Sequence, residues 1–293
     1  EKAFDAIDNS IRTTNQTNKI IWIQNPTTKE HFIYKRWIKD TNKQIHVEGY
    51  NVTVSNHKDV EHIHTTYHLA DSLGYLAQSW IQKAHDLRDK ANEAEQKEKN
   101  AKYRSKYYYD YIGGWLERAE GVIFDYTIGN FDFTLPNCYH LDWGYSPDPL
   151  ALGRLAVDKR NKKLYCKEYI YATEVNDVPQ ALINVGLQRN DLIVCDTSEP
   201  RTRAAIAKAG FNIQNAVKNQ IVDDLRSMKD YEIILDSDSP NFKMEFDNYV
   251  WNDKKASIPI DKYNHLCDGL RYAYNRLVSK SIMGNSFGQS NLT

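Results

Sequence analysis

The sequence of 293 residues has no apolar run approaching the roughly 18 residues that cross a bilayer, and its start lacks the charged and apolar regions of a signal peptide. It also lacks an excess of either charge, because 38 Lys and Arg balance 39 Asp and Glu. This balance excludes a uniformly basic protein that coats nucleic acid and an acidic disordered tail. Any surface for nucleic acid must be local, and we expect a cytoplasmic protein that does not enter a membrane.

Cysteine, glycine and proline are scarce as well. The four cysteines form no Cys-x-x-Cys pair, which argues against a zinc knuckle and a disulfide framework. Each lies beside apolar residues, so we expect packing roles for Cys138, Cys166, Cys195 and Cys267. None of the 13 glycines is followed by lysine, so the phosphate-cradling P-loop is missing. Aromatic residues make up 12% of the chain, which favours a packed globular protein.

Apolar patterning predicts the elements of the first part of the chain. The run at 20–23 predicts a buried strand, followed by a turn at 24–26 and a helix over 31–38. Alternation over 47–54 predicts a half-buried strand, and the pattern over 69–106 predicts helix. Acids interrupt the bases in the later half of that helical stretch. A solvated helical face is therefore favoured there over a DNA-binding one.

The second part of the chain predicts three meander strands, then strands that alternate with helices. The meander consists of a strand ending at Asp142 and strands over 150–157 and 164–171. Strands at 191–196 and 232–235 follow, among helices at 178–187, 201–209, 222–228, 241–251 and 264–278. This order predicts an α/β fold with a mixed sheet and helices packed on it. The irregular segment after residue 125 predicts domains at 1–125 and 138–293, with 126–137 as a linker.

Two predicted strands end in a carboxylate, Asp142 and Asp196, each directly before a turn. Catalytic groups gather outside the carboxyl ends of parallel strands, so these two side chains can meet. Carboxylates brought close together repel one another unless a cation lies between them, and such oxygen ligands suit Mg²⁺ or Mn²⁺. Aspartate at a strand end is also a common turn or N-cap residue, which remains the alternative.

Three segments carry a specific resemblance. In this order, LDWGYSPDPLAL, VCDTSEPRTRAAIAKAGF and YNHLCDGLRYAYNRL resemble the nuclease domain of tailed-phage terminase large subunits. The resemblance implies a ribonuclease-H-like fold and an endonuclease that cuts double-stranded DNA during genome packaging. It implies that Asp142, Asp196 and Asp268 bind two Mg²⁺ or Mn²⁺ ions and catalyse phosphodiester hydrolysis.

The resemblance extends upstream to the end of the family's packaging ATPase domain. Residues 20–26 resemble the strand and coupling segment after its second nucleotide motif, and 65–124, with GGWLERAEGVIF, resemble the approach to the nuclease. We therefore expect residues 1–125 to be a small α/β and helical, lid-like remnant of a P-loop ATPase domain. The chain opens at Glu1 without an initiator Met, which suggests a piece of a longer polypeptide. Without the P-loop, we expect this piece not to hydrolyse ATP.

Periodicity and resemblance disagree about Asp268. An apolar stripe runs along the last predicted helix through Leu266, Leu270, Ala273, Tyr274 and Leu277. At 100° per residue Asp268 falls on nearly the opposite side, so the pattern alone predicts a solvent-facing residue. Only the resemblance assigns it to the site.

Further candidates surround the three aspartates. Glu199 is a candidate extra metal ligand, and Asp148, between prolines, is interpreted as a turn residue. His265 could contact a phosphate, although capping or packing is favoured. The basic residues that could follow DNA phosphates, in a salt-sensitive and non-specific way, are Arg201, Arg203, Lys208 and Lys218. A zinc site is rejected for the cluster of His57, His62, His64 and His68, because no Cys or Glu completes a tight spacing.

Two other functions stay open. One is a transposase or Holliday-junction resolvase of the same fold, and the other is a non-catalytic docking module for portal or small subunit. The leading hypothesis implies double-stranded DNA, the portal protein and the small terminase subunit as partners, with a homo-oligomeric ring only in the assembled motor. It implies the host cytoplasm as location, with transient residence at the portal vertex of the procapsid.

Overall fold

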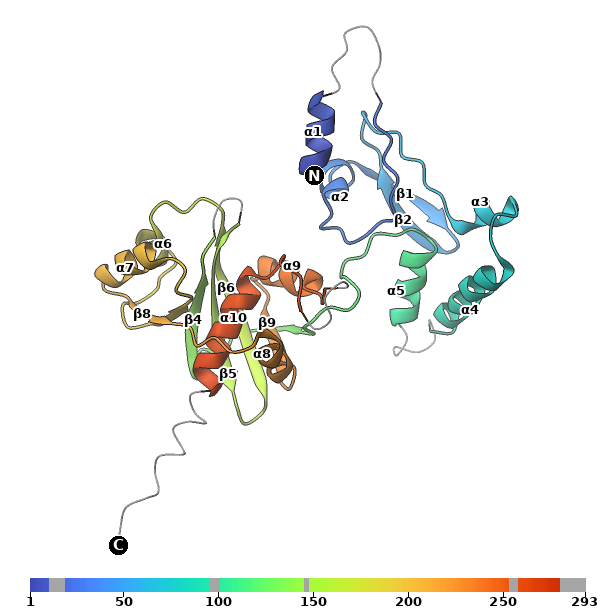
Figure 1. Ribbon diagram of the computed structural model, residues 1–293. Coiled ribbons are helices and arrows are strands. Elements are labelled where there is room, and N and C mark those ends of the chain that lie inside the picture. The colour runs from blue at the N-terminus through green and yellow to red at the C-terminus, as the bar shows by residue number, and fades with distance from the viewer. Residues whose placement is uncertain (11–18, 95–100, 145–147, 253–257, 280–293) are drawn as a thin grey trace. The chain divides into compact units, whose positions relative to one another are not determined.

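The computed structural model describes residues 1–10, 19–94, 101–144, 148–252 and 258–279. The chain divides into two compact units, Glu1–Arg118 and Ala119–Thr293, each with its own core (Figure 1). The second unit thus begins before residue 125, where the boundary was predicted. The stretch 126–137, predicted as a linker, supplies a strand to the sheet of that unit. No helix in the described residues is long and apolar enough to span a membrane.

The first unit is a two-stranded sheet with short helices. Its elements are α1 (Lys2–Ser10), α2 (Phe32–Trp37), β1 (Asn42–Val47), β2 (Tyr50–Ser55), α3 (Tyr67–Ser72), α4 (Gln78–Ala94) and α5 (Ala101–Asp110). The strands form an antiparallel hairpin around Glu48 and Gly49, whose φ angles of 48° and 82° are those of a tight two-residue turn. The single strand predicted over 47–54 is therefore wrong, because the turn lies inside it.

Two other predictions for this unit need correction. The predicted strand at 20–23 is absent: no strand in the described part of the chain pairs with it, and Ile21 and Ile23 are 85% and 92% exposed. An apolar run becomes a strand only where a neighbouring strand satisfies its backbone groups. The helix predicted over 69–106 is divided into α3, α4 and α5, with Gly74 in a left-handed conformation after α3.

The second unit contains the predicted mixed sheet. Its strands are β3 (Thr127–Gly129), β4 (Asn137–Asp142), β5 (Leu150–Asp158), β6 (Lys163–Ala172), β7 (Leu192–Cys195), β8 (Asn212–Asn215) and β9 (Glu232–Asp236). They lie in the order β3-β9-β6-β5-β4-β7-β8. The predicted meander β4-β5-β6 is antiparallel, and the other neighbours pair in parallel. Strands β3 and β8 were not predicted, because three or four partly exposed residues carry no periodic signal.

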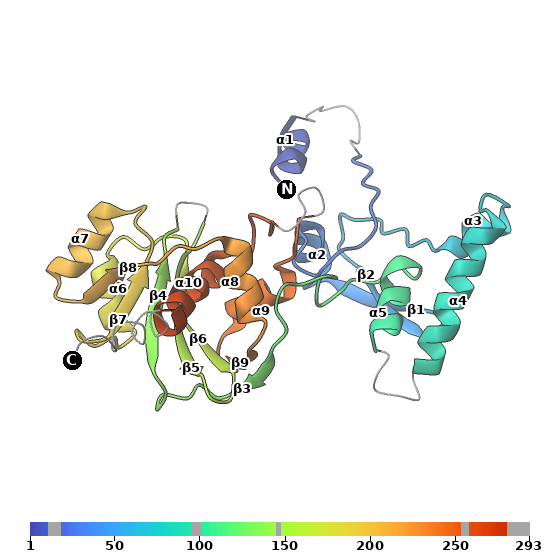
Figure 2. The same ribbon diagram turned by 60° about the horizontal axis from the view of Figure 1, so that its bottom comes forward.

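Helices cover both faces of this sheet (Figure 2). The helices are α6 (Val178–Asn184), α7 (Pro200–Lys208), α8 (Ile221–Met228), α9 (Pro240–Asn248) and α10 (His265–Tyr274). Residues of α6 and α7 share one apolar core with the sheet, and residues of α8, α9 and α10 share the other. The four cysteines are free and buried, as predicted from their apolar neighbours.

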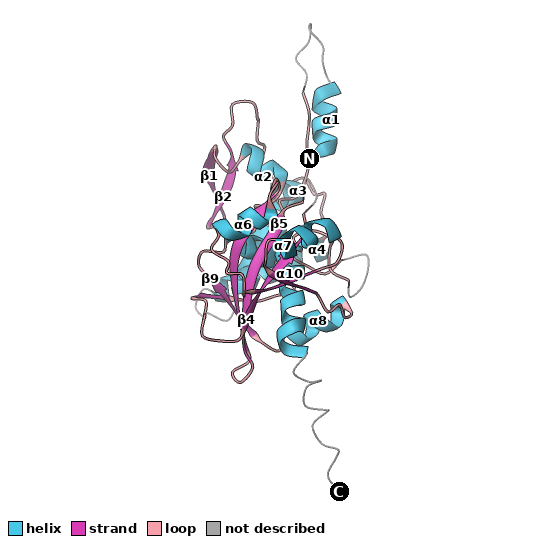
Figure 3. Ribbon diagram, turned by 90° about the vertical axis from the view of Figure 1, so that its left-hand side faces the viewer, coloured by secondary structure: helices cyan, strands magenta, loops and turns pink. Residues whose placement is uncertain are grey.

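Helix α10 lies directly on β4 and β5 (Figure 3). It also contacts α8 and α9, so eight of its ten residues are buried rather than a single stripe. Its Gly269 lies against the ring of His140, a fully buried residue of β4. A Cβ atom at position 269 would lie 2.3 Å from His140 Nδ1, so only glycine permits this approach.

We predict that Gly269→Ala lowers the free energy of unfolding by about 1–3 kcal/mol, because it overpacks the contact with His140. Helix propensity alone predicts the opposite sign, a gain of about 1 kcal/mol. Urea unfolding of Gly269→Ala, His140→Ala and the double variant distinguishes the expected loss from the expected gain. The double variant should lose less than the sum of the two single losses. Additive losses would show that overpacking against His140 is not the cause of the lower stability.

Candidate active site

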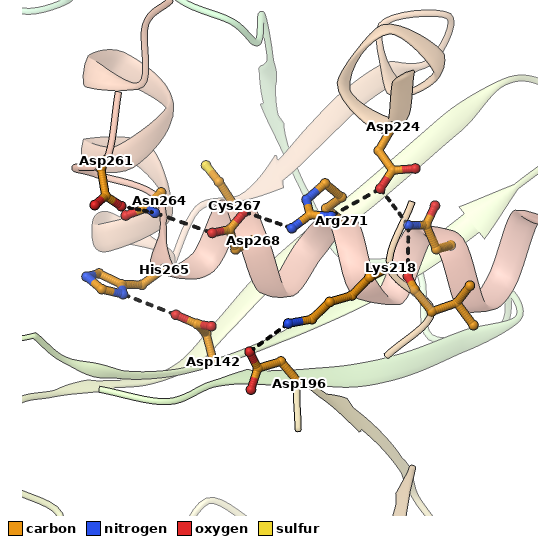
Figure 4. Close-up of polar contacts among 12 residues, drawn as sticks. Asp142, Asp196, Lys218, Asp224, Asp261, Asn264, His265, Cys267, Asp268 and Arg271 are labelled. Carbon is orange, nitrogen blue, oxygen red and sulfur yellow. Dashed lines mark hydrogen bonds and ion pairs between the residues drawn. The ribbon is translucent and has the colours of Figure 1, made fainter. Parts of the chain in front are cut away.

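Three aspartates gather at one end of the central strands (Figure 4). Asp142 is the last residue of β4, and Asp196 directly follows β7. These strands are parallel neighbours, with Leu141 opposite Cys195, so both carboxylates leave the sheet at the same edge. Asp268 comes from the first turn of α10, which lies on β4.

Burial and mutual repulsion make this edge unfavourable for negative charge. The pKa of Asp142 is raised to about 6: burial is the main cause, the charges of Asp268 and Asp196 add to it, and His265 acts against them. Burial also raises the pKa of Asp268 despite the neighbouring Arg271. For Asp196, hydrogen bonds from Ser198 and Lys218 outweigh burial and lower the pKa. A cation among these carboxylates would therefore be stabilised.

Each carboxylate has a basic partner in the structure. His265 Nδ1 lies 3.1 Å from Asp142 Oδ2, Lys218 Nζ lies 3.0 Å from Asp196 Oδ2, and Arg271 Nη2 lies 3.3 Å from Asp268 Oδ1 (Figure 4). As they lie, no three acidic, His or Cys side chains among the described residues are close enough to hold a metal ion. The three aspartates nevertheless offer carboxylate oxygens, the ligands that Mg²⁺ and Mn²⁺ prefer. The chemistry of the site thus fits these ions.

Comparison with known proteins identifies the family. The model described as phage terminase large subunit matches residues 1–108, and that of the terminase RNase H-like domain matches 142–276. The chain belongs to the phage terminase large-subunit family. It is 30% identical over 223 residues to the large terminase subunit of Bacillus phage SPP1, covering 70% of this chain and 50% of that protein. The chain thus spans about half the length of this curated relative.

Solved terminase structures resemble the chain as well. The large-terminase nuclease domain of bacteriophage SPP1 with bound Mn has 24% identity and a TM-score of 0.47, covering 53% of this chain and 98% of that one. The large-terminase nuclease domain of P22 has 18% identity and a TM-score of 0.45, covering 53% and 91%. The large terminase of a thermophilic bacteriophage has 19% identity and a TM-score of 0.44, covering 87% and 62%. The predicted ribonuclease-H-like α/β fold is confirmed by the family match and the sheet.

The structure also places the other residues that were predicted for the site. His265 and Lys218 contact them directly. Glu199 is the N-cap residue of α7, and its Oε2 accepts a 3.5 Å hydrogen bond from Thr202. Arg203 donates to Asn215 on β8. Arg201 and Lys208 are exposed on α7.

Asp148 and the histidine cluster are also placed by the structure. His265 Nε2 lies 3.8 Å from Asp148 Oδ1, so this exposed turn residue faces the site. In the first unit, His57 Nδ1 accepts from the backbone N–H of Asp59, and His62 Nδ1 accepts from that of Ser55. These two histidines thus stabilise their own loop.

The expectation from periodicity that Asp268 faces solvent is wrong. Its side chain is only 22% exposed, because α10 is enclosed by the sheet on one side and by α8 and α9 on the other. Sequence reasoning also missed Asp224 and Arg271, a buried pair behind Asp268. Arg271 follows Asp268 by three residues, a spacing that places both on one helix face. Asp224 has no such signal, because its approach depends on how α8 packs.

We predict that Asp142→Asn stabilises the metal-free protein at pH 7.5 by about 1–3 kcal/mol, because the buried charge is removed. At that pH the carboxyl is charged in both the folded and the unfolded state, and the folded state carries the penalty. Below pH 6 the folded state takes up the proton first, so the gain shrinks and disappears near pH 4. Urea unfolding in EDTA between pH 4.5 and 7.5 measures it.

A matched control has the opposite sign. The carboxylate of Asp236 is buried too, but its bonds with Lys167 and two backbone N–H groups outweigh burial and lower its pKa. Asp236→Asn should therefore destabilise the protein at pH 7.5, and because the folded pKa lies below the ordinary value of 3.8, the loss should stay nearly constant down to pH 4.5. A gain for Asp142→Asn that is independent of pH would contradict the assignment of a raised pKa.

Proposed function

We propose that this chain is a metal-dependent endonuclease that cleaves double-stranded viral DNA during genome packaging. The observation that carries the proposal is the convergence of three carboxylates, from β4, from the end of β7 and from α10, in a member of the terminase large-subunit family. Hydrolysis of a phosphodiester needs little from the protein beyond such ligands and a positioned substrate.

Asp142, Asp196 and Asp268 would hold two Mg²⁺ or Mn²⁺ ions, with Glu199 as a further ligand. Held by these residues, the ions would supply activation of a water molecule and stabilisation of the leaving 3′ oxygen. The chain holds the ligands in place beforehand. Ser198 donates from its backbone N and its Oγ to Asp196 Oδ1, at 2.7 and 2.5 Å, and thereby fixes that carboxylate. Asp196 Oδ2 is left facing Lys218.

Basic residues around the carboxylates would position the DNA. The side chain of Lys218 is 52% exposed, so its ammonium can exchange Asp196 for a phosphate at small cost. Arg201 and Arg203, both on α7, would add phosphate contacts that carry no sequence information. Hydrogen bonding and the charge of Asp142 raise the pKa of His265 although burial alone would lower it, so its protonated form could also meet a phosphate.

The wider role follows from the family. We propose that the first unit, Glu1–Arg118 in the structure and 1–125 as predicted, is the end of the packaging ATPase domain, which would not hydrolyse ATP as it stands because it has no Gly-Lys pair for a P-loop. Portal protein and small subunit would be the partners, and the chain would form a ring only in the assembled motor. It would act in the host cytoplasm and transiently at the portal vertex.

The test is incubation of the purified chain with supercoiled plasmid in Mn²⁺, in Mg²⁺ and in EDTA. We predict nicking and linearisation that need the metal and fall at least 100-fold in Asp196→Ala, because one ligand is lost. Circular dichroism confirms that the variant folds. Asp230→Ala, which replaces an exposed aspartate two residues before β9, serves as a control that should cut like the wild type.

Other outcomes separate the alternatives. Joining of DNA ends without hydrolysis would favour a transposase, and cutting confined to four-way junctions would favour a resolvase. If wild type and variant are equally inert and calorimetry detects no Mn²⁺ binding, the nuclease proposal is wrong. Metal-independent binding to portal or small subunit would then favour a docking module.

A further inference from the structure

Arg271 occupies an unusual place for a cation beside a metal site. Its side chain is only 5% exposed, and its two terminal nitrogens reach different carboxylates: Nη1 lies 3.2 Å from Asp224 Oδ2 and Nη2 lies 3.3 Å from Asp268 Oδ1 (Figure 4). The planar guanidinium fork fixes both partners at once, which a lysine could not do. Arg271 therefore links α8 to the proposed ligand Asp268.

Asp224 is itself held firmly. It is 4% exposed, and Asn275 Nδ2 donates to its Oδ2 at 2.7 Å while Asn219 Nδ2 donates to its Oδ1 at 3.0 Å. The same Asn275 amide donates to the backbone oxygen of Val217. A buried carboxylate with these bonds has little freedom to turn, so it fixes the guanidinium in turn.

The charges of Asp224 and Arg271 cancel, which leaves Asp268 with its negative charge. Asp224 and Arg271 together carry no net charge, so the guanidinium is compensated from behind and Asp268 keeps its own charge for a metal ion. Without Asp224, the buried cation would neutralise Asp268 alone and would repel a divalent ion. Lys218 differs: it has Asp196 as its carboxylate partner and is half exposed, so it can move away.

We infer that Asp224 and Arg271 form a positioning pair that orients Asp268 and keeps its charge available to the metal ions. The pair holds Oδ1 of Asp268 and leaves Oδ2 for coordination; within the described residues, Oδ2 has a single hydrogen bond, at 3.3 Å from Asn264 Nδ2. Both residues are buried, so neither would touch the DNA or the reacting atoms. The inference rests on the proposed function, because it assumes that Asp268 is a ligand.

The experiment is a calorimetric titration of Mn²⁺ into the full chain and four variants, with thermal unfolding to confirm folding. We expect Asp224→Asn to weaken Mn²⁺ binding about tenfold or more, the size found for partners of metal ligands. We expect Asp224→Asn/Arg271→Gln to recover most of that loss, because the double variant restores neutrality and keeps an N–H donor for Asp268. A purely structural pair would give a double variant no better than the single one.

Two further variants serve as controls. Asp236→Asn breaks another buried ion pair, with Lys167, and should lower stability without changing Mn²⁺ affinity. Asp196→Ala removes a proposed ligand itself. In plasmid cleavage, Asp224→Asn should reduce kcat at low Mn²⁺, recover at high Mn²⁺ and leave KM for DNA unchanged, because the pair does not contact DNA.

The outcomes distinguish the two proposals. If Asp196→Ala loses Mn²⁺ binding while Asp224→Asn binds like the wild type, the positioning pair is wrong and the nuclease stands. Equal losses in the single and the double variant also overturn the pair. If Asp224→Asn does not fold, Arg271→Lys decides, because a lysine keeps the charge but cannot fix both carboxylates: a tenfold loss of Mn²⁺ affinity supports the pair, and wild-type affinity overturns it. A wild type that neither binds Mn²⁺ nor cuts DNA overturns both proposals.

Discussion

The close approach of α10 to β4 is the constraint on which the site depends. Gly269 lies against His140, and this contact brings the first turn of the helix to the end of the strand that carries Asp142. A larger residue would lift the helix and carry Asp268 away. The helix is then enclosed by α8 and α9 on its outer side, which is why a polar network can exist there at all. Packing thus determines the geometry of the carboxylates.

That packing has an electrostatic cost which the neighbouring basic groups reduce. The charges of Asp142 and Asp268 destabilise the fold, as their raised pKa values indicate, whereas the partners of Asp196 lower its pKa. The partners differ in mobility, and the difference has a function in our proposal. Lys218 is exposed and exchangeable, whereas Arg271 is buried and tied to Asp224. Lys218 can move away when a metal ion or a phosphate binds, whereas Arg271 stays in place and orients Asp268.

The sequence predicted the architecture of the second unit better than that of the first. The meander, the alternating strands and helices, and the two strand-end aspartates follow from local periodicity and turn chemistry. The prediction of a strand at 20–23 was wrong because a strand needs a neighbouring strand to pair with, and apolar patterning does not reveal whether one is present. The apolar stripe misjudged Asp268, since a helix packed against the sheet on one side and against α8 and α9 on the other buries most of its residues. Only the resemblance assigned it to the site.

Asp224 is a site residue that local sequence patterns cannot predict. It lies 44 positions before Asp268 on a different helix, and nothing in its local pattern separates it from the exposed Asp223 beside it. Its significance arises only when α8 packs against α10 and the guanidinium of Arg271 lies between the two acids. A buried ion pair rarely adds stability, because desolvation offsets its attraction. Conformational specificity, here the orientation of one carboxylate, is the better reason for such a pair next to a site that must hold cations.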